Sequence, residues 1–501
     1  MAIAKTWDAE NWDREDWERL RREIPLAAAV FEKVRSLRGR FHVPGHQGVG
    51  VGPLGDRWGT AFLDDLTELE GLDNLAVPTE AIAEAQRLAA ETFGADRSWF
   101  LVNGSTVGLQ AALLAVSRIA PSSRQKIIVG RNAHQSILTG LVLSGLQPIW
   151  VKPEVDRDWT IATHVAPEAI DQALEQHPDV CAVCVVSPTY YGTTSDLEAI
   201  ARLCQQKNIP LIVDEAHGGH FVAHSDLPQA ALEAGADIVI QSAHKTLGSL
   251  TQSALLHYQK KPEQANSSLL ENSLSDSLRL LQSSSPSYLL MMSLDVARSH
   301  LQKHGHWDWQ RALNMARKLG DRLITIPNIT VLNNAQKDPT RVIISTAQLG
   351  WTGYALDEYL DQRGIAVEIG DYGAIGLVIT PQTQSQSIEH LIQSLKTLPE
   401  PPGSGARFQF SQYQYDGNSQ SIITPREAWF SPRKSINIED AIGEVCAEWI
   451  CPYPPGIPVL VPGEEITTDA LNFLRNIRAI GGELSGLLDS TFQTVQVISK
   501  R

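Results

Sequence analysis

Short apolar runs alternate with helical stretches between residues 80 and 300, and this alternation restricts the possible fold more than any other feature. Parallel strands are joined by crossover connections that are usually helices, and strands buried on both faces appear as continuous apolar runs. The pattern therefore predicts an α/β domain built on a mostly parallel sheet. The runs that predict strands lie in SWFLVNGSTVG, KIIVGRNAH, QPIWVKP, VCAVCVVSPTYYG, IPLIVDEAHGGH and DIVIQSAHK.

Five of these runs end in a polar cluster. Ligands of open parallel sheets bind at the carboxyl ends of the strands. One polar cluster in that position could occur by chance, whereas five indicate a ligand site. We expect the clusters to lie at one edge of the sheet and to form the functional site. They are NGST (103–106), RNAH (131–134), SPTYYG (187–192), DEAH (214–217) and SAHK (242–245).

Three of the clusters supply complementary chemistry. NGSTVG is a turn that opens a helix, whose free backbone N–H groups favour an anion such as a phosphate, although Ser105 and Thr106 could simply cap that helix. Asp214 follows the apolar run IPLIV, and burial there raises a carboxyl pKa unless a cation lies opposite. Lys245 follows the apolar run DIVI, where a lysine is either a solvated loop residue or a nucleophile.

Together these groups match the needs of pyridoxal 5′-phosphate (PLP). This cofactor takes a lysine for the Schiff base, a carboxylate that keeps the pyridine nitrogen protonated, and a cup for the phosphate. Asp214 precedes Lys245 by 245 − 214 = 31 residues, about one strand–helix–strand unit, so neighbouring strands can direct both at one ring. Ser242 and His244 would add phosphate contacts, and His134 could stack on the ring.

The DEAH cluster allows two other interpretations. It matches the acidic motif of a family of nucleic-acid helicases, but that function requires a GxxxxGK[ST] loop, and the sequence contains no Gly-Lys dipeptide. His217, His220 and His224 form H-x2-H-x3-H beside Asp214, a spacing that suggests a metal site. The glycines of HGGHFVAH favour an irregular turn instead, so we expect no metal and ordinary polar contacts for the last two histidines.

Composition narrows the possible partners and the compartment. The chain has 42 basic and 57 acidic residues and a net charge of −15, so the phosphate backbone of nucleic acid would be repelled. The sequence contains no apolar run of about 18 residues, the length that would predict a membrane span. Its charged N-terminus lacks the apolar region of a secretory signal. Cys181 and Cys184 form a CxxC without a second such pair, and we interpret them as core residues. We therefore expect a reduced, cytoplasmic protein.

The chain divides into four predicted regions. The first is an amphipathic helical arm whose tryptophans, Trp7, Trp12 and Trp17, are expected to dock on the body or on a second subunit. The Pro/Gly/Ser-rich stretch TLPEPPGSGA (397–406) predicts a linker. The regions are the arm (1–40), a large PLP-binding domain (41–300), a small α+β domain (301–398) and a C-terminal domain (407–501).

Several long segments resemble the motif set of the Orn/Lys/Arg decarboxylases, a family of PLP enzymes of fold type I with the aspartate aminotransferase architecture. The resemblance extends from about residue 36 to about residue 465. The sequence resembles the short form of the family, which is without the receiver-like N-terminal domain of the long bacterial enzymes. The segments are FHVPGHQG, LVNGSTVG, SPTYYG, VDEAHGGHF, SAHKTLGSLTQSA, SSSPSYLLMMSLD, TPREAWF and PYPPGIPVLVPGE.

The resemblance implies a role for each matching site residue. Lys245 would be the Schiff-base lysine and Asp214 the partner of the pyridine nitrogen. His134 would stack on the ring and His217 would lie near the cofactor. Gln47 and Gln135 stand where similar proteins often have lysine, and these departures concern fine specificity or the subunit contact rather than PLP. The residues implied to hold the phosphate are Ser105, Thr106, Ser242 and His244.

The implied reaction is decarboxylation of a basic amino acid, arginine before lysine or ornithine, to CO2 and agmatine or a diamine. Amino transfer or aldol-type cleavage by another PLP enzyme of this fold is the alternative, because a His-Lys pair also occurs in serine hydroxymethyltransferase-like enzymes. A carboxylate must meet the distal cation of the substrate, and Glu464 and Glu465 are candidates, unless they form an exposed acidic turn. Lys245 or a nearby histidine would reprotonate the substrate carbon. The resemblance also implies a homodimer, with QSSSPSYLL as a cross-subunit segment.

Overall fold

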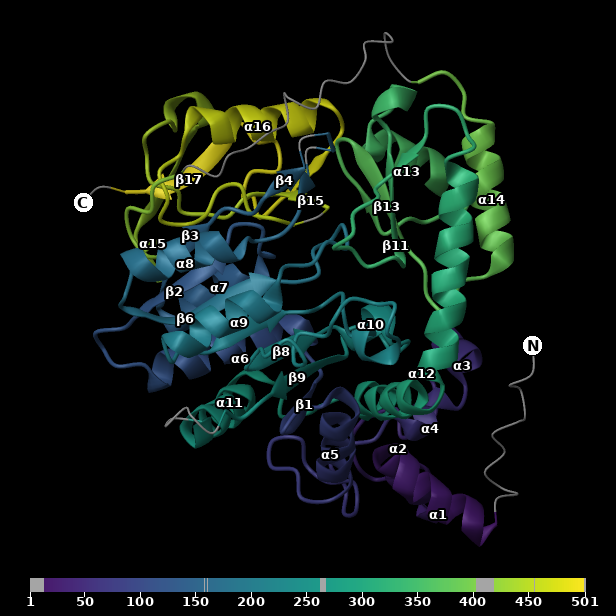
Figure 1. Cartoon of the computed structure of the whole chain (residues 1–501). Coiled ribbons are helices and arrows are strands. Elements are labelled where there is room, and N and C mark those ends of the chain that lie inside the picture. Colours follow the sequence, from purple (N-terminus) through teal and green to yellow (C-terminus); the bar gives the residue numbers. More distant parts are fainter. Residues whose placement is uncertain are drawn as a thin grey trace.

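The computed structural model describes residues 13–156, 158–159, 161–261, 267–401, 419–454 and 456–499. Its central element is a seven-stranded sheet in the order β1-β9-β8-β7-β6-β2-β3 (Figure 1). β9 runs antiparallel to both of its neighbours, and the pairs from β8 to β3 are parallel, which confirms the predicted mostly parallel sheet. The strands are β1 (Arg97–Leu101), β2 (Lys126–Gly130), β3 (Gln147–Val151), β6 (Val180–Val186), β7 (Leu211–Asp214), β8 (Ile238–Gln241) and β9 (Ala254–Tyr258).

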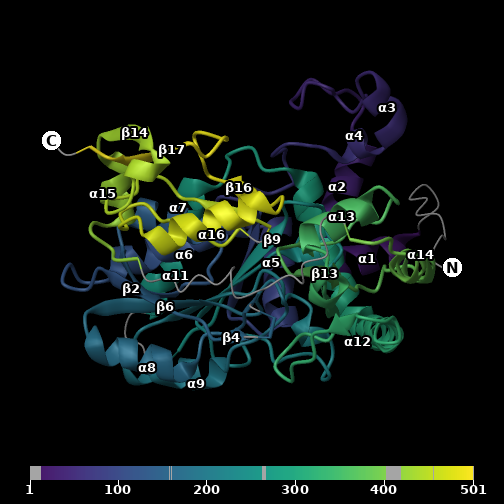
Figure 2. The same cartoon turned by 90° about the horizontal axis from the view of Figure 1, so that it is seen from above.

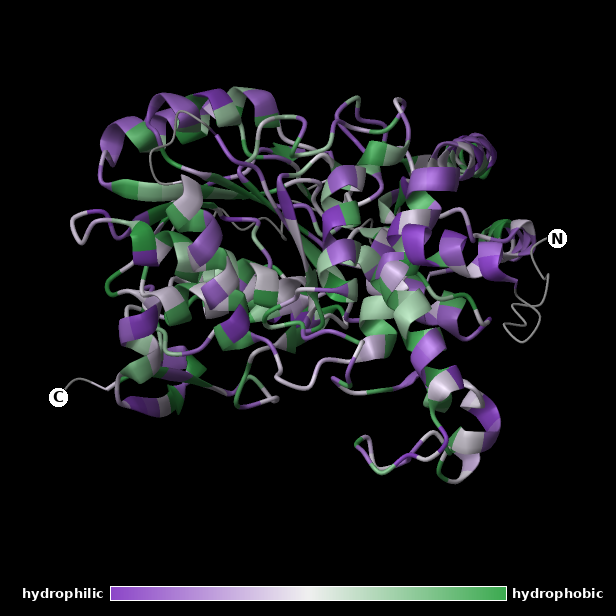
Figure 3. Cartoon of the chain, turned by 90° about the horizontal axis from the view of Figure 1, so that it is seen from below, coloured by the Kyte–Doolittle hydropathy of each residue, from purple (hydrophilic) through white to green (hydrophobic). Residues whose placement is uncertain are grey.

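Both faces of this sheet are buried. Successive side chains of a strand point to opposite faces, so neighbouring residues of one strand belong to two different apolar clusters. Val183 and Val213 belong to one apolar cluster, while Cys184 and Ile212 belong to another. The strands are mostly green in the hydropathy colouring of Figure 3. Cys181 and Cys184 are both buried free thiols of β6, so their interpretation as core residues is confirmed. The continuous apolar runs of the sequence thus follow from a sheet covered on both sides.

Two groups of helices supply these covers. The first packs around the cluster that contains Cys184, and the second around the cluster that contains Val183. The first group is α6 (Gly104–Ile119), α7 (Ser136–Ser144) and α11 (Ser267–Leu281). The second group is α2 (Pro25–Ser36), α5 (Ala81–Phe93), α8 (Pro167–Gln176), α9 (Leu197–Gln206) and the first half of α12 (Tyr288–Leu323).

The connection between β7 and β8 differs from the expected strand–helix–strand unit. It consists of turns and one short 3-10 helix, η2 (Phe221–Ala223), and the segment LPQAALEAGA (227–236) forms turns. Pro228 lies at its start, and Gly235 has a φ of +93°, a value that side-chain-bearing residues rarely adopt. The strands nevertheless lie side by side, with Asp214 opposite Ile240.

The N-terminal arm docks on the body. α1 (Arg14–Glu23) and α2 follow each other closely, and Trp17 packs against the large apolar cluster. The backbone N–H of Leu26 donates to the buried carboxylate of Asp295 on α12 at 2.9 Å. Trp7 and Trp12 lie outside the described residues. Beyond α2, the chain forms a projection with α3 (Pro53–Trp58) and α4 (Ala61–Asp64), which stands out from the body in Figure 2.

A second, antiparallel sheet of four strands has the order β10-β11-β13-β12. The 36-residue helix α12 reaches from the first sheet to this one, so the predicted domain boundary at residue 300 lies inside a continuous helix. The elements of this part of the chain are β10 (Thr330–Val331), β11 (Arg341–Ser345), β12 (Ile369–Gly370), β13 (Ala374–Val378), η3 (Ala347–Leu349), α13 (Gly353–Asp361) and α14 (Ser385–Lys396).

Among the described residues, no helix is long and apolar enough to cross a membrane.

The C-terminal part, yellow in Figure 1, lies beside α7 and β3. It has its own apolar cluster and two two-stranded ladders, β14 with β17 and β15 with β16. Its elements are α15 (Pro425–Phe430), β14 (Arg433–Asn437), η5 (Ile438–Asp440), β15 (Cys451–Tyr453), α16 (Thr468–Ala479), β16 (Glu483–Ser485) and β17 (Thr494–Ile498). A further short ladder joins β4 (Val155–Asp156) to β5 (Ile161–Ala162).

Candidate active site

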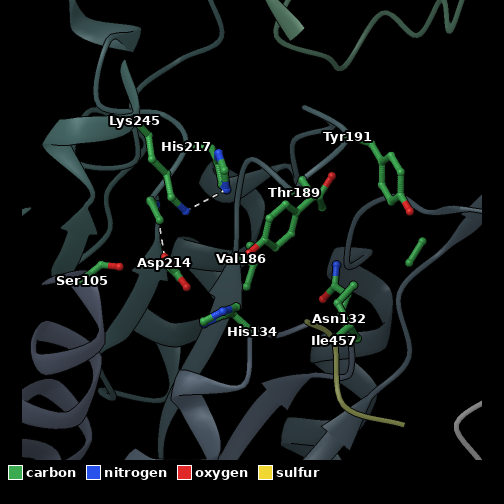
Figure 4. Close-up of a pocket in the computed structure, with 13 residues that line it drawn as sticks. Ser105, Asn132, His134, Val186, Thr189, Tyr191, Asp214, His217, Lys245 and Ile457 are labelled. Carbon is green, nitrogen blue, oxygen red and sulfur yellow. Dashed lines mark hydrogen bonds between the residues drawn. The ribbon is translucent and has the colours of Figure 1, made fainter. Parts of the chain in front are cut away.

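The five polar clusters converge at the carboxyl ends of β1, β2, β6, β7 and β8. Each cluster begins within two residues of the end of its strand, and Asp214 is itself the last residue of β7. All five contribute to one pocket, which holds about 530 Å³ of space between its atoms, the open mouth included (Figure 4). The lining residues are Ser105, Asn132, His134, Ala162, Val186, Thr189, Tyr190, Tyr191, Asp214, Ala216, His217, Lys245 and Ile457.

Lys245 extends into this pocket from α10 (Ala243–Thr246), a single helical turn directly after β8. Its Nζ lies 2.9 Å from Nε2 of His217 and 5.6 Å from the centre of the Tyr190 ring. Burial lowers the pKa of the Lys245 amine, whereas the nearby Asp214 raises it. A lysine in such surroundings is a better nucleophile than a solvated lysine, so the geometry favours the nucleophile over the loop residue.

Asp214 is buried at the floor of the same pocket, below Lys245 in Figure 4. Its Oδ1 accepts a hydrogen bond from the backbone N–H of Ala216 at 3.1 Å. Burial raises the pKa of this carboxyl, while Lys245 and the Ala216 N–H lower it. A carboxylate so placed is stabilised by a cationic partner, and the protonated pyridine nitrogen of PLP has the required charge.

The first turn of α6 lies beside the lysine. Gly104 has a φ of +74°, which lets the chain turn sharply from β1 into the helix. The next residue, Ser105, lines the pocket, and the hydroxyl of Ser242 donates to its Oγ at 2.9 Å. Thr106 follows in the same half-buried turn. The first N–H groups of a helix have no partner within it, so this turn is suited to a phosphate.

Two predicted histidines differ in their placement. His134 lines the pocket, and its Nδ1 accepts from the backbone N–H of Ser136 at 3.2 Å. Burial and the charge of Lys245 lower the pKa of His134 to about 4, so its ring is neutral and has a face free of charge near pH 7. His244 does not line the pocket, and its Nδ1 lies 2.9 Å from the carbonyl oxygen of Ser253.

The other histidines of the DEAH segment make the expected polar contacts. His220 pairs with the buried carboxylate of Asp338 at 3.2 Å, and Nε2 of His224 lies 2.9 Å from Oε1 of Gln310. The three histidines therefore have separate partners. Within the described ranges, no group of three or more His, Cys, Asp and Glu side chains is arranged to hold a metal ion.

Glu464 and Glu465, the predicted substrate carboxylates, do not line the pocket. Glu464 is buried and binds Arg131, with 3.1 Å between Oε2 and the guanidinium. Glu465 is half-buried, and its backbone N–H donates to Gln420. Their role in substrate binding stays a prediction.

The structure adds residues that the sequence did not single out. Arg341, from β11 of the second sheet, is fully buried and reaches His217. Asn132 lines the pocket, and within the described part of the chain neither polar atom of its buried side chain has a hydrogen-bond partner. Ile457 enters from the C-terminal part (Figure 4). Asn132 lies in a cluster that the sequence did mark, and Ile457 lies in the segment PYPPGIPVLVPGE, whereas no local pattern points to Arg341.

The chain matches the models of a known protein family and the sequences of several bacterial enzymes. The model of the Orn/Lys/Arg decarboxylase major domain matches residues 24–338, and the model of the C-terminal domain of the same enzymes matches residues 409–496. The arginine decarboxylase of Bacillus subtilis is 33% identical, over 96% of this chain and 98% of the relative. That of Halalkalibacterium halodurans is 34% identical, over 95% and 98%. The constitutive lysine decarboxylase of Escherichia coli is 24% identical, over 92% and 78%.

The chain also resembles solved structures of lysine decarboxylases. The lysine decarboxylase LdcF of Francisella novicida superposes with a TM-score of 0.80 at 21% identity, covering 96% of this chain and 82% of that chain. A lysine decarboxylase of Pseudomonas aeruginosa gives a TM-score of 0.79 at 20% identity, covering 96% and 81%. The fold is therefore shared with these enzymes, and the expected fold type I architecture is confirmed.

Proposed function

The chain belongs to the Orn/Lys/Arg decarboxylase family, and from this premise we propose that it decarboxylates arginine with PLP bound at the pocket around Lys245. As a member of this family, it is an amino-acid decarboxylase. The preference for arginine is supported by relatives named arginine decarboxylase at 33 and 34% identity over nearly the whole chain. The relative named lysine decarboxylase is more distant, at 24%.

The observation that carries the proposal is the meeting of three groups in one pocket. They are the amine of Lys245, the buried carboxylate of Asp214 and the first turn of α6 at Ser105. Lys245 would attach the cofactor covalently, Asp214 would hold a proton on its ring nitrogen, and Ser105 with Ser242 would bind its phosphate. His134 would lie against its ring. When bound, PLP supplies an electron sink for the carbon that loses CO2.

Lys245 lines the pocket and would be the group that returns a proton to the substrate carbon. Its Nζ lies 2.9 Å from Nε2 of His217, within direct hydrogen-bond distance, so His217 would hold the amine in position without a bridging water. His217 is buried, and burial holds its pKa well below the usual value. The imidazole therefore stays neutral and would orient the lysine rather than take up its proton.

The proposal is tested in two stages. The protein is first incubated with PLP, reduced with borohydride and mapped by mass spectrometry, with Lys245→Ala as the matched variant. We expect the cofactor on the Lys245 peptide and on no peptide of the variant. The loaded enzyme is then given arginine, lysine and ornithine separately, with CO2 and amine measured together. We expect CO2 and agmatine from arginine, and release of CO2 from none of the three would contradict the proposal. An aminotransferase would instead form a keto acid.

We also propose a homodimer. The projection beyond α2, which includes α3 and α4, exposes large apolar side chains, among them Phe41 at 97% and Trp58 at 56%, and it stands clear of the body (Figure 2). Exposed apolar groups of this size are typical of a surface that a partner covers. We expect light scattering to give twice the chain mass, and Phe41→Asp to shift the protein towards the monomer. A fully active, monodisperse wild-type monomer would contradict this.

A further inference from the structure

His217 is held at both ring nitrogens. Its Nδ1 lies 2.6 Å from a terminal nitrogen of Arg341, and its Nε2 lies 2.9 Å from Nζ of Lys245. Lys245 and His217 follow neighbouring strands of the seven-stranded sheet, whereas Arg341 is the first residue of β11 in the four-stranded sheet. In Figure 4, the side chains of Lys245 and His217 point toward each other across the top of the pocket.

The arginine determines where the imidazole carries its proton. A guanidinium has five N–H donors and no acceptor, and it stays protonated in proteins. Nδ1 of His217 must therefore accept a hydrogen bond from Arg341. A neutral imidazole that accepts at Nδ1 carries its proton at Nε2. The imidazolium form would set an N–H group against the guanidinium N–H, and burial of His217 disfavours that charge as well.

The position of this proton determines the charge of the lysine. Nε2–H is a donor directed at Nζ of Lys245, so Nζ must accept. An ammonium group has three donors and no acceptor, whereas a neutral amine has a lone pair. We propose that Arg341 is a positioning residue which, through the tautomer of His217, holds Lys245 as a free amine before the cofactor arrives. This inference rests on the proposed function of Lys245 and deepens it, because the free amine is the nucleophilic form.

The groups that face Lys245 shift its pKa in opposite directions. Burial lowers the pKa of Lys245, Asp214 and Glu368 raise it, and Arg341 lowers it again. The two carboxylates would therefore favour an ammonium, and the hydrogen-bond chain from Arg341 opposes them. Burial also lowers the pKa of each histidine in this environment. The facing groups are Asp214 and His217 beyond β7, Tyr190 beyond β6, His134 beyond β2, His244 on α10, Arg341 on β11, and Glu368 before β12.

The tautomer can be measured directly on the cofactor-free protein. Nitrogen-15 NMR of histidine-labelled protein distinguishes a protonated from an unprotonated ring nitrogen, and the His217→Asn spectrum assigns the signals. We expect Nδ1 of His217 to be unprotonated and Nε2 to be protonated at neutral pH. A wild-type spectrum with a proton on Nδ1 would overturn the proposal, and this measurement needs no Arg341 variant to fold.

The charge of Lys245 is measured by competitive acetylation of the same cofactor-free protein, quantified by peptide mapping against the exposed Lys207. In Arg341→Met, we expect the pH profile of Lys245 to move to higher pH. Its reactivity below the new pKa should fall about tenfold for each unit of the pKa rise. Arg341→Lys keeps a cationic donor and should stay close to wild type. Thermal unfolding checks that both variants fold.

Identical acetylation profiles for wild type and a folded Arg341→Met would also overturn the proposal. If Arg341→Met does not fold, the proposal is tested by the tautomer of His217 in the wild-type protein and by the acetylation profile of Lys245 in Arg341→Lys. Neither measurement involves turnover or PLP. The inference can therefore fail while the decarboxylase proposal stands, and a protein that releases no CO2 can still show the predicted tautomer.

Discussion

The guanidinium of Arg131 and the carboxylate of Glu464 form a buried ion pair, 3.1 Å apart, between the end of β2 and the C-terminal part of the chain. Arg131 also donates to the carbonyl oxygens of Pro458 at 2.6 Å and Val459 at 3.1 Å. The neighbouring residue Ile457 lines the active-site pocket. This pair therefore ties the pocket wall contributed by the C-terminal part to the strand-end cluster of the central sheet.

Replacing Glu464 by alanine is expected to destabilise the protein strongly. The change leaves a guanidinium buried without its anion, and the removal of one partner of a buried pair costs about 3–5 kcal/mol. Urea denaturation of the cofactor-free protein measures the effect. Glu465→Ala is the matched control. The half-buried Glu465 side chain forms no ion pair within the described part of the chain, so its removal should change the free energy of unfolding by about 0.5 kcal/mol or less.

Glu464→Gln distinguishes this structural role from the predicted role in substrate binding. We expect a lowered unfolding midpoint and, in the folded protein, a KM for arginine close to wild type, because Glu464 does not line the pocket. A large rise in KM with an unchanged midpoint would instead support the substrate role.

Ser242→Ala is expected to weaken cofactor binding. The Ser242 hydroxyl donates to Ser105 in the first turn of α6, and a hydrogen bond that holds a charged phosphate contributes about 1.5–3 kcal/mol. The dissociation constant for PLP should rise about tenfold or more, as measured by equilibrium titration. Ser36→Ala, at an exposed serine at the end of α2, is the control and should bind like wild type. Unchanged affinity in Ser242→Ala would remove this residue from the phosphate site.

Asp214→Asn is expected to slow the reaction far more than it weakens cofactor attachment. The amide keeps the shape of the side chain but loses the charge that would hold the ring nitrogen protonated. Removal of one such electrostatic contact costs about 10²- to 10³-fold in kcat. Steady-state kinetics and borohydride trapping on Lys245 measure the two effects separately. Asp226→Asn, at an exposed position, serves as the control. A variant with wild-type kcat would contradict the assigned role.

The His220–Asp338 pair predicts a specific acid dependence of stability. Burial alone would raise the pKa of Asp338, but His220 and the Thr340 hydroxyl hold it at about 2, below its value of about 3.9 in unfolded chains. The folded state thus favours the carboxylate. Its contribution is complete above about pH 4 and is lost as the pH falls towards 2.

Asp338→Asn should therefore be less stable than wild type at pH 5, with a deficit that shrinks as the pH falls from about 4 to about 2. Denaturant unfolding across this range measures the deficit. Asp321→Asn, at an exposed position on α12, should show no such trend. A deficit that is independent of pH would contradict the depressed pKa.

The sequence predicted the central sheet and the edge at which the site lies. Apolar runs such as VCAVCVV require burial on both faces, and the polar residues that follow them must then emerge at the strand ends. Lys245 and Asp214 were identified in this way, because Asp214 directly follows such a run and Lys245 closes the polar cluster SAHK after another. The same reasoning wrongly predicted a helix between β7 and β8, where the structure has turns and one short 3-10 helix. A crossover joins two strands without fixing the conformation of every residue between them.

What the sequence by itself determined is thus the set of chemical groups at the strand ends, because burial and strand direction are local consequences of the apolar pattern. Only the tertiary structure decided which distant residues complete them. Arg341 lies 124 positions from His217 and comes from another sheet, and Glu464 lies 333 positions from Arg131. These contacts depend on how the two sheets and the C-terminal part pack together, and local periodicity carries no information about that packing. The position of a proton between Arg341, His217 and Lys245 follows from the packing alone.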